Sequence, residues 1–379
     1  MADSRTDSVW TWPDLHDAQR TVLLEVLING ATSRAELARR TGLSRTSLTR
    51  LTRDLVELGL VVEGETNAPN GRGRPSEMLN LRPASAQFVG IKLTGEALYA
   101  VVTDLHANVI EIEERPLVSR YVPDVVSQMA EMVTRFRETY PRLASVGICL
   151  AGDVEQVRGR SVVVGSHFLG WDDVPLASLV EAETGLPIAV GNDVQSLTAA
   201  HHWFGAGVGR SSLVLIGLGA GIGAGIVVNG ELVRGSRGHP GKVGHIPVRD
   251  SGPTCDRGHM GCASAYVTIP AILHNAADTS FDRVIERAEA GDAVAKAAID
   301  DAGHALGVVI AQLVNLIDPE KVIVTGEGLI VARAGAASLD AALAEKLDPA
   351  SERSEIEVRD FAFSDYAWAA AVSAIRRVV

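Results

Sequence analysis

The sequence predicts an α/β protein that begins with a small winged helix-turn-helix domain. From Phe88 onward, stretches of alternating apolar and polar residues take turns with helical stretches, which is typical of the α/β class. Residues 1–82 instead contain short helical stretches separated by glycines, followed by two strand-like stretches. The chain has 379 residues, of which 46% are apolar. This length and composition allow a large hydrophobic core and two or three domains.

The net charge of −12 is unevenly distributed along the chain. Residues 1–82 contain eleven arginines and eleven acidic residues, so the rest of the chain carries the whole negative excess. Within residues 33–62, six arginines face only three acidic residues. An acidic protein with a locally basic N-terminal head is compatible with nucleic-acid binding through the head alone.

Cysteine content and apolar patterning indicate a cytoplasmic protein without a membrane span. Three cysteines in 379 residues argue against a disulfide-stabilised secreted protein. The N-terminus has no basic start followed by an apolar run, so we expect no signal peptide. The longest apolar run, residues 213–228, is short for a membrane helix and rich in glycine, which favours a strand–turn–strand interpretation.

Two short helices are predicted at the start of the head. Residues 21–30 form an apolar stretch that ends at Gly30, a residue type common at helix C-termini. Ser33 and Glu36 have the spacing of a capping box, in which each side chain satisfies a backbone amide at the helix start. Gly42 is expected to end this second helix.

Residues 43–59 predict a third helix, which completes a helix-turn-helix pattern. Ser44 is its expected cap, and leucines at positions 48, 51, 55 and 58 form one apolar stripe. The start of this helix is where the motif reads base edges in the major groove, so hydrogen-bonding and cationic side chains are needed there. The alternative is an ordinary surface hairpin of helices. The candidate DNA-binding residues are Ser44, Arg45, Thr46, Ser47, Thr49 and Arg50.

Residues 60–81 read as strand, polar loop and strand, which predicts a wing. The loop contains the sequence GRGRP, in which Arg72 and Arg74 alternate with glycines. Two arginines on a slim extended backbone suit a narrow minor groove, so both join the candidate DNA-binding residues. The alternative is a solvated loop. Residues 82–87 are the predicted linker to the larger part of the chain.

The larger part combines α/β patterning with six ordered motifs. Residues 88–117 predict three short strands, residues 122–139 a helix, and residues 293–317 an alanine-rich helix. The motifs are FLGW (168–171), GNDV (191–194), GAGIGAGIVVNGELVRGSRG (219–238), GKVGH (241–245), a cysteine segment (254–264) and NLIDPEKVIVTGEG (315–328). Together they resemble the ROK family of repressors, open reading frames and kinases, over residues 83 to 379.

This resemblance implies a two-lobed fold of the actin/hexokinase, or ribonuclease H-like, type with a sugar between the lobes. The winged helix at the N-terminus resembles the repressor branch of the family. We therefore divide the chain into residues 1–82, a winged helix-turn-helix DNA-binding domain, and residues 83–379, an effector-binding and oligomerisation domain.

The residues expected for sugar phosphorylation are largely replaced. Asp193 matches the family's catalytic base. In the first phosphate loop, however, Lys92, Thr94 and Glu96 replace the family's Asp, Gly and Thr, and Ala220 replaces a Thr in the second loop. A glutamate beside a triphosphate is repulsive, and loss of the glycine hinders backbone approach. We therefore expect no kinase activity and no catalytic residues.

The cysteine segment resembles a degenerate form of the family's structural zinc site. Cys255 and Cys262 match its first and third cysteines, and His245 matches its histidine. The second cysteine is replaced by Arg257, which is not a metal ligand. His259 could supply a fourth ligand and complete a Cys₂His₂ set for zinc. The sequence leaves this open; we expect no tightly held zinc and no other cofactor.

The sugar contacts implied by the resemblance are also altered. Lys242 and Ser264 replace two glutamates that would accept hydrogen bonds from sugar hydroxyls. A lysine there favours an anionic ligand, such as a sugar phosphate or a sugar acid. The candidate effector-binding residues are Asn192, Asp193, Lys242 and His245.

The resulting hypothesis is a repressor that binds operator DNA as a homodimer or tetramer and responds to a sugar, sugar phosphate or sugar acid. One alternative is a sugar kinase with an attached DNA-binding head. Another is a regulator that needs no effector. ATP turnover with any sugar would favour the kinase, whereas the residues at positions 92 and 96 argue against it.

Overall fold

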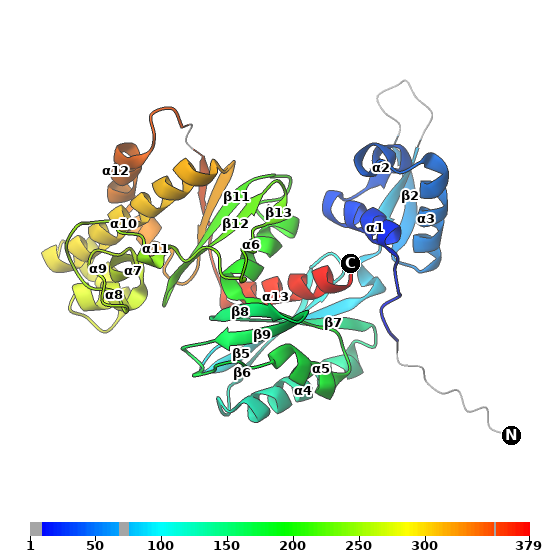
Figure 1. The fold of residues 1–379 in the computed structure, drawn as a ribbon, viewed down its shortest axis with the longest axis horizontal. Helices are drawn as coiled ribbons and strands as arrows, with labels where there is room; N and C mark the ends of the chain where they lie inside the picture. Colours follow the sequence, from blue (N-terminus) through cyan, green and yellow to red (C-terminus); the bar gives the residue numbers. More distant parts are fainter. Residues whose placement is uncertain (1–9, 68–75, 352–353) are drawn as a thin grey trace. The chain divides into compact units, whose positions relative to one another are not determined.

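A computed structural model describes residues 10–67, 76–351 and 354–379 (Figure 1). The chain divides into two compact units. One unit runs to Asp193 and resumes with Tyr366–Val379, and the other comprises Val194–Asp365. The chain therefore passes between the units twice.

The N-terminal head is a winged helix, as predicted. Three helices are followed by a hairpin, and a short strand between the first two helices pairs with that hairpin in the order β1-β3-β2. The elements are α1 (Asp17–Asn29), β1 (Thr32–Ser33), α2 (Arg34–Thr41), α3 (Arg45–Glu57), β2 (Val61–Asn67) and β3 (Ser76–Leu81).

The predicted capping box is only half realised at α2. The Ser33 hydroxyl accepts a hydrogen bond from the Glu36 backbone amide at 3.2 Å. The Glu36 carboxylate pairs with Arg40 along the same helix at 2.8 Å. A complete capping box forms instead at α1, where His16 caps the helix and Gln19 returns the bond. Histidine is not among the usual N-cap residues, so the sequence pattern gave no sign of it.

The apolar stripe of α3 forms the core of the head. Leu48, Leu51 and Leu55 are fully buried, as predicted. The prediction was wrong for Leu58, which is 45% exposed. The helix ends at Glu57, and Gly59 takes a positive φ of 72°, so the chain turns away before Leu58 can continue the stripe.

The first unit also contains a five-stranded sheet in the order β10-β7-β4-β5-β6. Strands β4, β7 and β10 are parallel, and the β4–β5 and β5–β6 pairs are antiparallel. The strands are β4 (Gln87–Leu93), β5 (Ala97–Asp104), β6 (Val109–Pro116), β7 (Leu143–Leu150) and β10 (Ile188–Asn192). A separate hairpin is formed by β8 (Asp153–Val157) and β9 (Arg160–Gly165).

Helices α4 (Val122–Thr139) and α5 (Leu176–Thr184) pack on this sheet through one large apolar cluster. Helix α13 (Phe363–Val378) packs directly against strands β4 and β7. A β-carbon placed at Gly90 would lie 1.9 Å from the Ala367 carbonyl oxygen, and one at Gly147 would lie 1.8 Å from that of Ala370. These two glycines therefore allow backbone contact between the helix and the sheet.

The second unit contains another five-stranded sheet, in the order β13-β12-β11-β14-β15. Strands β11, β14 and β15 are parallel, and the β11–β12 and β12–β13 pairs are antiparallel. The strands are β11 (Leu213–Leu218), β12 (Ile222–Val228), β13 (Glu231–Leu232), β14 (Lys321–Thr325) and β15 (Glu355–Val358). The helices are α6 (Asp193–Phe204), α7 (Ser264–Val267), α8 (Ile269–Asn275), α9 (Phe281–Glu289), α10 (Ala293–Ile317), α11 (Ile330–Ala334) and α12 (Ala336–Lys346).

The two five-stranded sheets have the same topology. In each sheet the first strand lies in the centre. Two antiparallel strands lie on one side of it, and two strands parallel to it lie on the other side. This repeated arrangement is the two-lobed fold that the sequence motifs predicted.

Helix α10 is the one helix of the described residues that is long and apolar enough to cross a membrane. However, 72% of its most apolar window is buried inside the protein, as in a core helix. The predicted linker begins with a short 3-10 helix (Pro83–Ser85) and leads into β4 with Ser85 and Ala86 buried. The domain boundary at residue 82 stays a prediction.

Candidate nucleic-acid interface, metal cluster and ligand residues

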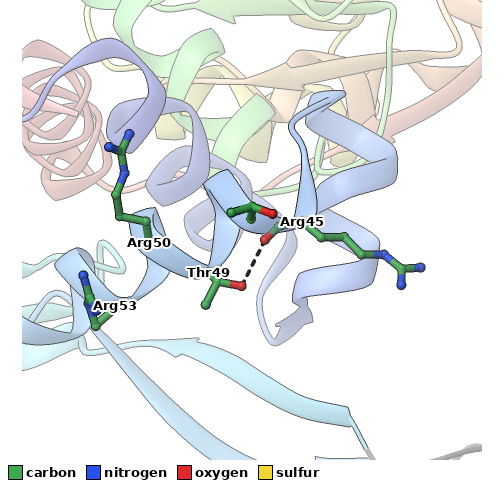
Figure 2. Close-up of a pocket in the computed structure, with 5 residues that line it drawn as sticks. Arg45, Thr49, Arg50 and Arg53 are labelled. Atoms are coloured by element: carbon green, nitrogen blue, oxygen red, sulfur yellow. Dashed lines mark hydrogen bonds between the residues drawn. The ribbon is translucent and has the colours of Figure 1, made fainter.

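One face of helix α3 presents a basic, exposed surface. Its first turns begin at Ser44, whose hydroxyl accepts a hydrogen bond from the Ser47 backbone amide at 3.1 Å. Five residues of this face line a hollow of about 370 Å³ (Figure 2). They are Arg45, Thr46, Thr49, Arg50 and Arg53.

Two arginines of this face, Arg45 and Arg50, differ from Arg34 at the start of α2 in their partners. The Arg34 guanidinium pairs with Glu63 and Glu77, which ties the start of α2 to the wing strands. Among the described residues, the guanidinium groups of Arg45 and Arg50 have neither a hydrogen bond nor an ion pair. Figure 2 shows Arg45 extending away from Arg50. The two charges are therefore available to an anionic partner.

The hydroxyl groups of the predicted site have local roles. The Ser44 and Ser47 hydroxyls bond to each other at 2.9 Å, and the Thr49 hydroxyl donates to the Arg45 carbonyl at 3.0 Å. Thr46 is exposed in the hollow. The predicted residues Ser44 to Arg50 are thus brought together on one helix start.

Arg53 was missed by the sequence analysis as a site residue. It follows Arg50 by three positions, so it lies on the same helical face, and that spacing could have revealed it. Its Nε atom lies 3.7 Å from Oε1 of Glu57, at the exposed end of the helix. The predicted wing residues Arg72 and Arg74 lie outside the described residues.

A second cluster brings together all four candidate metal ligands. The ligand atoms of His245, Cys255, His259 and Cys262 lie within 4.8 Å of one another. The Cys255 Sγ atom is 3.6 Å from His245 Nδ1. The two cysteines are buried and the two histidines are exposed. A tetrahedral zinc ion at usual bond lengths places its ligand atoms about 3.3–3.8 Å apart, so small side-chain rotations would close this set around Zn²⁺.

The backbone of the cysteine segment holds these ligands in place. A short 3-10 helix (Val243–His245) presents the first histidine. The Cys255 amide donates to the His259 carbonyl at 2.8 Å, which closes a tight loop between these two ligands. Cys262 pairs with Pro247 in an isolated β-bridge. The sequence could not establish this convergence because it depends on loop closure.

The four residues predicted to bind a small effector fall into two groups, one in each unit. Asn192 ends β10, and its side-chain amide donates to the Gly152 carbonyl at 3.0 Å. Asp193 begins α6 and is 7% exposed. In the other unit, Lys242 and His245 are both exposed; Lys242 precedes the 3-10 helix and His245 ends it.

Asp193 forms a buried ion pair with Lys92. Lys92 lies near the end of β4 and is 4% exposed. Its ammonium group also stands over the ring of Tyr366, 4.2 Å from the ring centroid. The Cys149 thiol nearby donates to the Tyr366 carbonyl at 3.2 Å. Burial raises the pKa of this thiol to about 12, so it is a neutral thiol at physiological pH.

A further carboxylate lies next to the loop between β11 and β12. A β-carbon placed at Gly219 would lie 2.4 Å from Glu327 Oε2. Glu327 follows β14, so the end of that strand places a carboxylate against the loop. This loop is the one that the sequence resemblance associates with phosphate binding, and a carboxylate there repels phosphate.

Family models match both parts of the chain. The ROK family model matches residues 88–371, and the MarR family model matches residues 14–73. Among curated relatives, the xylose repressor of Caldicellulosiruptor bescii is 26% identical over 80% of this chain and 81% of its own length. The DNA-binding transcriptional dual regulator NagC of Escherichia coli is 28% identical over 79% of this chain and 77% of its own length.

Solved structures share the fold. The crystal structure of a ROK family transcriptional regulator, a homologue of the E. coli MLC protein, covers 95% of this chain and 96% of its own, with a TM-score of 0.81 and 24% identity. A ROK family glucokinase from Streptomyces griseus covers 77% of this chain and all of its own, with a TM-score of 0.65 and 23% identity. The regulator matches nearly the whole chain, whereas the kinase leaves about a quarter of it unmatched.

Proposed function

Because the chain belongs to the ROK family and carries a MarR-like winged helix, we propose that it is a transcriptional repressor that binds operator DNA. The observation that carries this proposal is the pair of exposed arginines, Arg45 and Arg50, on the helix that winged helices insert into the major groove. The two named relatives support it, since one is a xylose repressor and the other is a DNA-binding transcriptional dual regulator. The hydroxyl-bearing residues Ser44, Thr46, Ser47 and Thr49 would contribute contacts to phosphates or base edges.

We further propose that the protein binds its operator as a homodimer or a larger assembly. A two-fold symmetric protein places its recognition helices about 34 Å apart, one helical turn of DNA. Random double-stranded DNA selected by the purified protein should therefore yield an inverted repeat with that spacing. A single asymmetric half-site among the selected sequences would contradict the dimeric proposal.

A small ligand is proposed to modulate operator binding through Asn192, Asp193, Lys242 and His245. Ligand binding can change DNA affinity only if the ligand prefers one arrangement of the protein over another. The exposed ammonium group of Lys242 favours an anionic sugar derivative, such as a sugar phosphate or a sugar acid.

Thermal unfolding against neutral sugars, amino sugars, sugar phosphates and sugar acids tests the ligand proposal. A ligand that binds only the folded protein at a hundred times its Kd stabilises it by about 2.7 kcal/mol, so Tm should rise selectively with an anionic sugar. Lys242→Met should abolish that rise. Lys296→Met, which removes another exposed lysine, should preserve it. No rise with any compound would favour a regulator without a sugar effector.

The cysteine segment is proposed to hold a structural zinc ion through His245, Cys255, His259 and Cys262. Two thiolates and two imidazoles form a legitimate tetrahedral zinc set, and the four ligand atoms already converge. When bound, zinc would cross-link this loop and fix the orientation of His245. His259 would take the place of the family cysteine that is Arg257 in this chain.

A sugar kinase with a DNA-binding head remains the competing function, because ROK kinases share the fold. Three features of this chain oppose phosphoryl transfer. Asp193, which would have to accept the sugar proton, is paired with Lys92. Glu96 follows Lys92 in the first phosphate loop, and Glu327 lies against the second loop. Steady ATP turnover with any sugar would overturn the assignment as a non-enzymatic regulator.

A further inference from the structure

The chain passes between its two compact units at two points, and each of these passages lies at the start of a helix. The first passage lies between Asp193 and Val194, at the first residue of α6. The second lies between Asp365 and Tyr366, in the first turn of α13. Any rearrangement of one unit against the other must therefore bend or displace the chain at these two helix starts.

The side chain of Lys92 contacts one residue at each passage, Asp193 at the first and Tyr366 at the second. The Lys92 ammonium group pairs with the Asp193 carboxylate and stands 4.2 Å from the centroid of the Tyr366 ring. All three residues belong to the same unit, and each is at most 7% exposed. Burial strengthens both the ion pair and the cation–π contact, because water screens them little.

The surroundings of Lys92 are rigid. It lies on β4, between two strands to which β4 is hydrogen-bonded. Helix α13 packs on the same strand with backbone contact at Gly90. The Cys149 thiol on the adjacent strand donates to the Tyr366 carbonyl. The lysine is therefore held by the sheet, while its partners stand at the points where the chain leaves and re-enters the unit.

We propose that Lys92 is a clasp that holds the two chain passages together and restrains movement of the chain at both helix starts. Removal of the lysine charge takes away the ion pair that Lys92 makes with the buried Asp193 carboxylate, which favours an opened state in which water reaches that carboxylate. Such an opening would be local, because the strands of the sheet keep their hydrogen bonds. The clasp does not depend on the proposed repressor function, and its test needs neither ligand nor operator.

Cys149 reports the opening of the clasp. Its side chain is fully buried against Tyr366, so alkylation requires movement at the second passage. The full-length protein is treated with N-ethylmaleimide under native conditions, and the labelling rate of each cysteine is followed by peptide mass spectrometry. Lys92→Met should accelerate labelling of Cys149 by about tenfold or more, with little dependence on added urea, as expected of a local opening. Labelling of Cys255 and Cys262, in the other unit, should stay unchanged.

Lys321→Met is the matched control, because it removes a lysine that is also buried and paired with two carboxylates, Glu355 and Glu357, but belongs to the other unit. It should not accelerate labelling of Cys149 under native conditions. Asp193→Asn keeps the size of the side chain and should give a smaller acceleration than Lys92→Met; the double variant should fall short of the product of the two effects.

The clasp is refuted if Cys149 in Lys92→Met is labelled at the wild-type rate. It is equally refuted if labelling accelerates only in step with global unfolding, with a steep urea dependence and matching acceleration at Cys255 and Cys262. Should Lys92→Met fail to fold, Asp193→Asn alone decides, because wild-type labelling of Cys149 in that variant would also overturn the proposal.

Discussion

Arg45→Ala together with Arg50→Ala should nearly abolish specific operator binding while leaving the fold intact. Arginines that read base edges contribute about 1–3 kcal/mol each, so the double variant should lose about 2–6 kcal/mol. That loss corresponds to a rise in Kd of about 30-fold or more. The measurement is fluorescence anisotropy with a labelled operator duplex, at a fixed salt concentration.

The fold should survive this change because both side chains are exposed, and their guanidinium groups make no ion pair with described residues. Surface substitutions of this kind change stability by about 0.5 kcal/mol at most. Arg333→Ala serves as the control. Arg333 is an exposed arginine of the second unit, and its partner Asp360 belongs to the same unit. This variant should leave operator affinity unchanged although the net charge changes by the same amount per residue.

The two single variants separate base reading from phosphate contact. An arginine that reads a base should relax the preference at one operator position, whereas one that binds a phosphate should weaken all sequences alike and lower the salt slope by about one. Arg45 and Arg50 extend away from each other in Figure 2, so we expect them to affect different positions. A double variant that binds the operator within twofold of wild type would remove α3 from the interface.

The head was predictable because its determinants are local in the sequence. Glycines, serine caps and leucine spacing define α2 and α3, and each acts within a few residues. The exceptions were also local in origin. His16 is an unusual cap, and Leu58 falls just beyond the helix end, where periodicity no longer applies.

In the larger part, the sequence predicted which residues carry the chemistry but not which of their side chains lie together. The motifs revealed Asp193 and the substitution at Lys92, but not that the two side chains pair, because 101 positions separate them. The same holds for Glu327 and Gly219, which are brought together by the adjacent strands β11 and β14. For the cysteine segment, the sequence spacing led us to expect no tightly held zinc, whereas closure of the loop brings four ligand atoms within reach of one ion.

Zinc content provides the second large expected effect. The protein purified without chelators should contain about one zinc ion per chain, and Cys262→Ala should lose it. Loss of one of four direct ligands should weaken zinc binding by about 100-fold or more, measured by competition with a chromophoric chelator. Cys149→Ala is the control, because Cys149 lies in the other unit and should not affect metal content.

His259→Ala distinguishes a four-ligand site from a three-ligand remnant. If His259 is a ligand, this variant should weaken zinc binding about as strongly as Cys262→Ala, because a tetrahedral structural site tolerates no open position. Cobalt substitution gives an independent readout, since two thiolate ligands produce a sulfur-to-cobalt charge-transfer band and a tetrahedral set gives strong visible absorption. A protein that lacks both zinc and the cobalt spectrum would show that the converging side chains pack as neutral groups. Unchanged zinc affinity in His259→Ala would instead confine the ligand set to His245, Cys255 and Cys262, with the position of Arg257 left without a replacement.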